Sequence, residues 1–196
     1  MYYNIYTNIR NGAWQCLIDN NICSLPVDVM KIARQCGFYV KKNSDVNELL
    51  DGEDAKTLYN GKDWFIIYND MNDTVDSRFA IAHELGHIFL GHEKSVGKYV
   101  CIEEFGKMPK SEQQADLFAL RLLCPACVLM NLELCSKKEI CDACRIPMHW
   151  AEKRSVRMSK LYKKRRFFSD PLEIKVNENF LEFYKRNNIN LTFDKE

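Results

Sequence analysis

The chain has 196 residues and a mass of 23.0 kDa, which is enough for one domain or for one domain with a small appendage. At this length about 70% of the unfolded surface can be buried, so a hydrophobic core needs no disulfide or metal to hold it together. The charges nearly cancel to +1, so composition alone indicates neither a nucleic-acid nor a membrane partner.

The start of the chain and its cysteines bear on the compartment. Residues 1–6 lack the charged stretch and apolar run of a signal peptide, and no apolar run approaches the roughly 20 residues of a membrane span. Nine cysteines, an odd number, are typical of reduced thiols when no secretion signal is present. We therefore expect a cytoplasmic protein with no membrane partner.

The N-terminal third predicts helices followed by a short strand. Residues 1–23 form one packed segment, for which a helix is one interpretation. Ser24 and Pro26 are typical of a helix start, and Gly37 ends the apolar stripe that follows. Residues 38–40 then predict a strand, and the polar stretch 43–62 holds a helix end, a turn and a strand near residue 57.

Residues 64–68 form a continuous apolar and aromatic run, which predicts a buried strand. Asp73, Thr74 or Asp76 would cap the helix that comes next. We expect a small antiparallel sheet packed on this helix, an arrangement that can form one wall of a substrate groove. A bound peptide can add to such a sheet as an extra strand.

The helix carries the motif His83-Glu84-Leu85-Gly86-His87, which has the H-E-x-x-H pattern. Positions i and i+4 lie on one helix face, so His83 and His87 can both bind one tetrahedral metal, while Glu84 can take a proton from metal-bound water. The alternative is a chance match. Apolar residues at helical spacing around the motif argue against chance, and the small Ala82 and Gly86 leave room for close packing beside the metal.

A third ligand must come from elsewhere. The metzincin pattern fails because Leu90 and Glu93 occupy the positions of its glycine and third histidine. Downstream, Glu112 and Asp116 lie at i and i+4 on a second predicted helix. Glu112 would bind the metal, and Asp116 would accept the free N–H of a ligand histidine. The alternative is an acidic helix start favoured by the helix dipole.

The segment between the two ligand helices reads as a long loop over residues 93–110, with a brief strand at 99–102. A loop of this length is expected to cover or shape a site. Tyr99 and His92 are equal candidates for stabilising an oxyanion. Ser111 and Gln114 predict a capping box at the start of the second helix, and Pro125 ends that helix.

Two cysteine pairs, Cys124-x-x-Cys127 and Cys141-x-x-Cys144, have spacing similar to that of a zinc ribbon. Cys124 ends an apolar helix, and the second pair falls on a predicted helix rather than on a tight turn. Cysteine also packs well as a small hydrophobic residue. We therefore favour core packing over a second zinc site.

Composition changes after residue 135, which predicts a zincin-like domain over residues 1–135 and a helical extension over 136–196. Within the extension, residues 136–166 resemble a helix-turn-helix in length, and a docking tail with a frayed end follows. Basic residues line one face of the longer helix. A solvated face is favoured over contact with DNA or an acidic partner. The positions on that face are Lys153, Arg157, Lys160 and Lys164.

Several of these stretches together resemble the ImmA/IrrE metallopeptidases of bacteria and their mobile elements, over roughly residues 26–166. The resemblance implies that His83, His87 and Glu112 bind one Zn²⁺ and that Glu84 is the catalytic base. Known members cut a helix-turn-helix repressor, which implies a similar protein substrate here. Pro147 replaces a serine that is usual in the tail turn. The matching stretches are Leu25-Pro26-Val27-Asp28, Ile67-Tyr68-Asn69-Asp70, Arg78-Phe79-x-x-Ala82-His83-Glu84-Leu85-Gly86-His87, and Glu112-x-x-Ala115-Asp116-x-Phe118-Ala119-x-x-Leu122-Leu123-x-Pro125.

The sequence thus predicts an α+β zincin-like zinc endopeptidase with a helical C-terminal extension. The alternative is a non-catalytic module that keeps the fold and docks a repressor or DNA. An intact Glu84 favours the enzyme, because a module that only binds does not need a general base.

Overall fold

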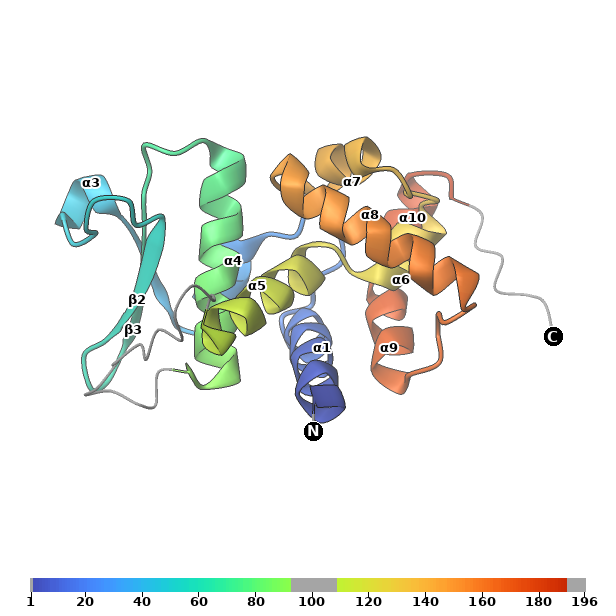
Figure 1. The fold of residues 1–196 in the computed structure, drawn as a ribbon, viewed down its shortest axis with the longest axis horizontal. Coiled ribbons are helices and arrows are strands. Elements are labelled where there is room, and N and C mark those ends of the chain that lie inside the picture. The colour runs from blue at the N-terminus through green and yellow to red at the C-terminus, as the bar shows by residue number, and fades with distance from the viewer. Residues whose placement is uncertain (1, 93–108, 190–196) are drawn as a thin grey trace.

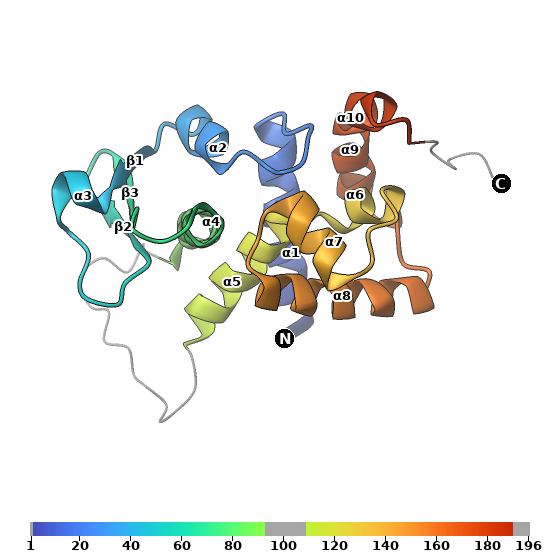
Figure 2. The same cartoon turned by 90° about the horizontal axis from the view of Figure 1, so that it is seen from above.

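The computed structural model describes residues 2–92 and 109–189, with side chains from residue 9 onwards. A small sheet lies at one end of the molecule beside α4, and the C-terminal helices gather at the other end, beyond α1 and α5 (Figures 1 and 2). The elements in chain order are α1 (Tyr2–Asp19), α2 (Val29–Gln35), β1 (Tyr39–Lys42), α3 (Asn43–Val46), β2 (Ala55–Tyr59), β3 (Trp64–Tyr68), α4 (Thr74–Leu90), α5 (Lys110–Leu123), α6 (Ala126–Asn131), α7 (Lys137–Cys144), α8 (Met148–Lys163), α9 (Pro171–Asn179) and α10 (Leu181–Arg186).

The N-terminal segment forms the helix α1, which agrees with the helical interpretation of residues 1–23. α1 packs against both α5 and α9. The next helix starts later than predicted, because Asp28 rather than Ser24 caps it. The Asp28 carboxylate accepts a hydrogen bond from the backbone N–H of Lys31 at 2.9 Å. Gly37 follows the helix with a φ of 75°, which explains why the helix ends there.

The sheet has three strands in the order β1-β3-β2, and it is mixed. β2 and β3 form the expected antiparallel hairpin, with Thr57 opposite Ile66. β1 runs parallel to β3, with Val40 opposite Ile66, so the prediction of an antiparallel sheet is wrong for this strand. The reason is the connection: the chain leaves β1 through α3, forms β2 as an edge strand, and returns through β3 in the direction of β1. The α+β class is correct.

α4 is capped by Asp73, one of the three residues that the sequence offered as its N-cap. Asp73 accepts hydrogen bonds from the backbone N–H groups of Val75 and Asp76, at 2.8 and 2.9 Å. The helix packs against β2, β3 and α5. A methyl group added at Gly86 would lie 3.1 Å from both Cα and the carbonyl oxygen of Ala115, which is too close. The expected close packing beside the motif is therefore present, between α4 and α5.

α5 starts without the predicted capping box. Its N-cap is Pro109, and no side chain there bonds a backbone N–H group. The side chain of Gln114 instead contacts His92, 2.9 Å away, so it is not available to the helix start. The prediction failed because a capping pattern is local, whereas the partner of Gln114 lies in a distant part of the chain. Pro125 separates α5 from α6, as expected. The predicted loop over residues 93–110 and its strand at 99–102 lie almost entirely outside the described residues.

The extension forms the predicted short helix, turn and longer helix. Ser136 and Glu139 make a complete capping box at the start of α7. The predicted docking tail consists of α9 and α10, which bury Phe180 and Tyr184 completely. Buried side chains from α1 to α10 belong to one hydrophobic cluster. The boundary at residue 135 stays a prediction.

α8 differs from the expected pattern at one position. Ala151 and Met158 are buried on the predicted inner face, and Arg154 is also buried. The Arg154 guanidinium donates a hydrogen bond to the carbonyl of Cys124 in the turn after α5. This basic residue therefore joins the extension to the helix that carries Glu112, and it is not part of a solvated face.

Two further expectations concern membranes and cysteines. The segment Lys110–Asn131 is long and apolar enough to cross a membrane, but 72% of its most apolar window is buried inside the protein, and core helices pass the same test. Cys124, Cys127 and Cys144 are buried, as core packing predicts. Among the described residues, the cysteines do not assemble into a group of three or more metal ligands.

Candidate metal centre

The three predicted ligands meet between α4 and α5. The Nε2 atoms of His83 and His87 lie 3.0 Å apart. Of the two carboxylate oxygens of Glu112, Oε2 lies 3.1 Å from Nε2 of His83 and Oε1 lies 3.4 Å from Nε2 of His87. A tetrahedral zinc with bonds of about 2.0–2.1 Å requires ligand atoms about 3.3–3.4 Å apart. The donor set and its spacing therefore fit one zinc ion.

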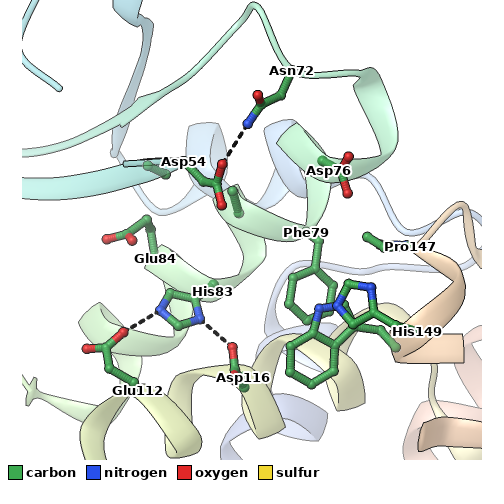
Figure 3. A pocket seen from close by; sticks show the side chains of 13 residues that line it. Asp54, Asn72, Asp76, Phe79, His83, Glu84, Glu112, Asp116, Pro147 and His149 are labelled. Carbon is green, nitrogen blue, oxygen red and sulfur yellow. Dashed lines mark hydrogen bonds and ion pairs between the residues drawn. The ribbon is translucent and has the colours of Figure 1, made fainter. Parts of the chain in front are cut away.

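Asp116 holds the first ligand in the orientation that metal binding needs. Its Oδ1 atom lies 2.9 Å from Nδ1 of His83, and Figure 3 shows His83 between Asp116 and Glu112. The Nδ1–H group donates to the carboxylate, which leaves the lone pair of Nε2 directed at the metal position. Burial lowers the pKa of His83, but its hydrogen bonds with Asp116 and Glu112 outweigh burial and raise that pKa to about 9. A metal that binds Nε2 therefore has to displace the proton that this atom shares with Glu112. The predicted contact of Asp116 is thus present.

Glu112 is held as an anion in the same place. Its hydrogen bonds with His83 and then with His87 lower its carboxyl pKa well below the usual value, against a smaller effect of burial. An ionised carboxylate is the form that binds a metal. The helix position predicted from sequence therefore gives Glu112 both the location and the charge of a ligand.

A second chain of contacts, which the sequence did not reveal, holds the other histidine. The Nδ1 atom of His87 lies 3.2 Å from Nδ1 of His92, and Nε2 of His92 lies 2.9 Å from Oε1 of Gln114. Because Gln114 accepts the Nε2–H of His92, the Nδ1 of His92 carries a lone pair and accepts the Nδ1–H of His87. This arrangement leaves Nε2 of His87 free to bind the metal. Burial lowers the pKa of His92, which favours the neutral ring that this chain requires.

The position of His92 changes its expected role. The sequence leaves His92 as one of two candidates for stabilising an oxyanion. In the structure, its two ring nitrogens instead contact His87 and Gln114. Tyr99, the other candidate, lies outside the described residues. No sequence signal separated these roles, because the His92–Gln114 pair joins positions 22 residues apart.

Glu84 lies next to the ligands and is 8% exposed. The hydroxyl of Thr57, on β2, donates a hydrogen bond to its Oε2 atom at 2.5 Å. Burial raises the pKa of Glu84, and the hydrogen bond from Thr57 acts in the opposite direction. A carboxylate with a raised pKa is a better proton acceptor near neutral pH than an ordinary surface glutamate. Thr57 was missed because its partner is 27 residues away and a strand threonine has many uses.

The centre opens into a cavity of about 630 Å³. One wall comes from Asp54 and Ala55 at the start of β2. The wall that carries the candidate metal ligands comes from α4 and α5. Another wall comes from the extension, where the Trp150 ring stacks on Phe79 with ring centroids 4.6 Å apart. Figure 3 shows Pro147 and His149 on the same side as Phe79. Pro147 and His149 complete this wall. The extension is therefore part of the site, although sequence reasoning treated it as an appendage.

A second cavity, of about 590 Å³, continues from the first along α5 and α8. The two share Asp116, His149 and Trp150 as walls. The metal position thus lies in the first of two connected cavities. Together they have room for a peptide of several residues rather than for a single small group.

An H-E-x-x-H helix beside a small sheet, with a glutamate from the next helix completing the ligand group, defines a zincin-like metallopeptidase. Comparison with protein families agrees: residues 33–143 match the family model of the IrrE N-terminal-like domain. The chain belongs to this family, the ImmA/IrrE metallopeptidases, as the motifs indicated. Searches of curated proteins and of solved structures found no match.

Proposed function

We propose that this protein is a cytoplasmic zinc endopeptidase whose substrate is a helix-turn-helix repressor. The observation that carries the catalytic part is the convergence of three ligands and a buried glutamate at one point. His83, His87 and Glu112 would hold the ion. Bound zinc supplies Lewis acidity toward a carbonyl and lowers the pKa of water to about 7.

Glu84 acts as the general base in this proposal. Thr57 occupies Oε2 of Glu84, which fixes the carboxylate and leaves its other oxygen to accept the proton of the attacking water. The same group then gives that proton to the leaving amine. A module that merely docks a repressor has no use for a buried carboxylate beside three metal ligands, so these features support the enzyme over the docking alternative.

The edge of the sheet offers a place for an extended substrate. In the part of the chain that the structure describes, β2 pairs with β3 on one side and has no strand on the other. Its first residue, Ala55, lines the cavity, and Thr57 contacts the proposed base. A peptide that adds to this edge by main-chain hydrogen bonds would pass the metal position. This geometry supports a protein substrate.

The proposal of a repressor substrate rests on the family. Known ImmA/IrrE members act on helix-turn-helix repressors, and this chain keeps the family's ligand and base positions. The proposed result of cleavage is the release of genes that the repressor controls.

The direct test first asks whether a neighbouring gene encodes a helix-turn-helix protein and then uses that protein as the candidate substrate. Purified, zinc-loaded enzyme is mixed with that protein, and the products are identified by mass spectrometry. We expect cleavage at one peptide bond, and no cleavage after zinc is removed with a chelator. An intact repressor after prolonged incubation, together with cleavage of an unrelated unfolded protein, would refute the substrate and leave the peptidase assignment in place.

A further inference from the structure

A third cavity, of about 380 Å³, lies at the end of α5 that is remote from Glu112. Its walls come from α1, α5, α6, α8, α9 and the segment that joins α8 to α9. Six arginine side chains line the cavity, whereas only one lining residue, Glu173, carries a carboxylate. The arginines are Arg10, Arg121, Arg154, Arg157, Arg165 and Arg166.

Burial makes this concentration of charge unusual. Arg121 and Arg154 are each 6% exposed, although arginine side chains normally keep their charge in water. Among the residues that the structure describes at this cavity, carboxylates are few. Asp170 pairs with Arg10 at 2.6 Å, and the buried Glu173 supplies the one lining carboxylate. Burial raises the pKa of Glu173, and the charge of Arg10 acts in the opposite direction.

The rest of the chain does not share this excess. Its total charge is +1, so the positive charge around the cavity is balanced by acidic residues elsewhere on the molecule. Like charges gathered in one concave site repel one another, and a low-dielectric wall strengthens that repulsion. An anion that enters the cavity would relieve it. The charge distribution therefore indicates a ligand with several negative charges.

We propose that this cavity is a binding site for a small phosphate-bearing molecule. Guanidinium groups match phosphate oxygens in a two-pronged geometry, and one phosphate group brings about two negative charges where a carboxylate brings one. The volume lies within the range of small-molecule sites. Double-stranded DNA is too wide to reach the buried Arg121 and Arg154, so a small molecule fits better than a duplex backbone.

The cavity borders the second cavity, with which it shares Arg121, Arg154 and Arg157, but it shares no lining residue with the cavity at the metal position. Arg121 follows Glu112 by nine residues on α5, which places their Cα atoms about 14 Å apart along the helix. The proposal consequently does not depend on the proposed peptidase activity, and each can fail alone.

The test is calorimetric titration of the zinc-loaded full chain with inorganic pyrophosphate at physiological salt. The cavity variant is Arg165→Gln with Arg166→Gln, since both side chains are exposed and their replacement spares the fold. The matched control is Lys160→Gln with Lys163→Gln, two exposed charges on α8 outside the cavity. We expect binding to wild type, at least tenfold weaker binding to the cavity variant, and a change below threefold in the control.

Two further arms identify the source and the place of binding. A nucleoside diphosphate that binds more tightly than pyrophosphate identifies a nucleotide ligand, and equal affinity identifies recognition of phosphate alone; both support the proposal. Metal-depleted protein should bind pyrophosphate as the zinc-loaded protein does. The proposal is overturned by an equal loss in the two double variants, by binding that disappears with the zinc, or by duplex DNA or polyglutamate binding more tightly than either phosphate ligand.

Discussion

Replacing His92 tests how the structure orients the second ligand histidine. In the described part of the chain, His92 accepts the Nδ1–H of His87 and in turn donates to Gln114. His92→Ala removes the acceptor while the candidate metal ligands His83, His87 and Glu112 remain. His87 is 6% exposed, so its N–H group loses a partner in a place that water reaches poorly.

The size of the effect follows from this burial. An unpartnered buried donor costs about 1–3 kcal/mol, which corresponds to about 5- to 150-fold in affinity. Partners of this kind typically contribute 10- to 100-fold to metal binding. We therefore expect zinc affinity to fall about 10- to 100-fold in His92→Ala. Gln114→Ala, one bond further from the metal, should lose only a few-fold.

The assay is competition with a chelator of known zinc affinity, with far-ultraviolet circular dichroism to confirm that each variant is folded. His149→Ala is the matched control, because His149 lines the same cavity and is exposed. Its affinity should equal that of wild type. A zinc affinity of His92→Ala within twofold of wild type would refute the reasoning about the orientation of His87.

Three other predictions concern the ligands, the helix contact and the docking tail. Purified protein should contain about one zinc per chain by elemental analysis. The variants His83→Ala, His87→Ala and Glu112→Ala should each lose the zinc. Full zinc occupancy in Glu112→Ala would exclude that residue as a ligand. Gly86→Ala should lower the free energy of unfolding by about 1–3 kcal/mol in a denaturant titration, because a methyl group would push α5 away, whereas a gain in stability would show that α5 yields freely. Phe180→Ala should cost about 3–5 kcal/mol and shift a single unfolding transition, while a separate early transition would show that the tail folds independently.

The parts of the site that sequence predicted are those with a local geometric reason. His83 and His87 are one helical turn apart, and Glu112 and Asp116 are one turn apart on the next helix, so their faces follow from spacing alone. The strand over residues 64–68 is a local signal as well, and so is the helix cap, which the sequence limited to Asp73, Thr74 or Asp76. Each of these features is present in the structure.

The parts that were missed depend on contacts between distant segments. Thr57, His92 and Gln114 act on Glu84 and His87 because β2 and α5 pack beside α4, which no spacing pattern encodes. The parallel pairing of β1 was missed for the same reason. The burial of Arg154 was not predicted, since burial of a charged side chain depends on the partner that the fold supplies.

The most direct test of the central claim, that Glu84 beside a bound zinc makes this chain a peptidase, is the Glu84→Gln variant. Zinc content and the rate of repressor cleavage are measured on the same preparation. Because the amide keeps the size of the side chain but cannot accept the proton, we predict about one zinc per chain and a rate at least about 10²-fold below wild type. Cleavage at an undiminished rate, or full relief of repression by Glu84→Gln in cells, would contradict the account and favour a docking mechanism.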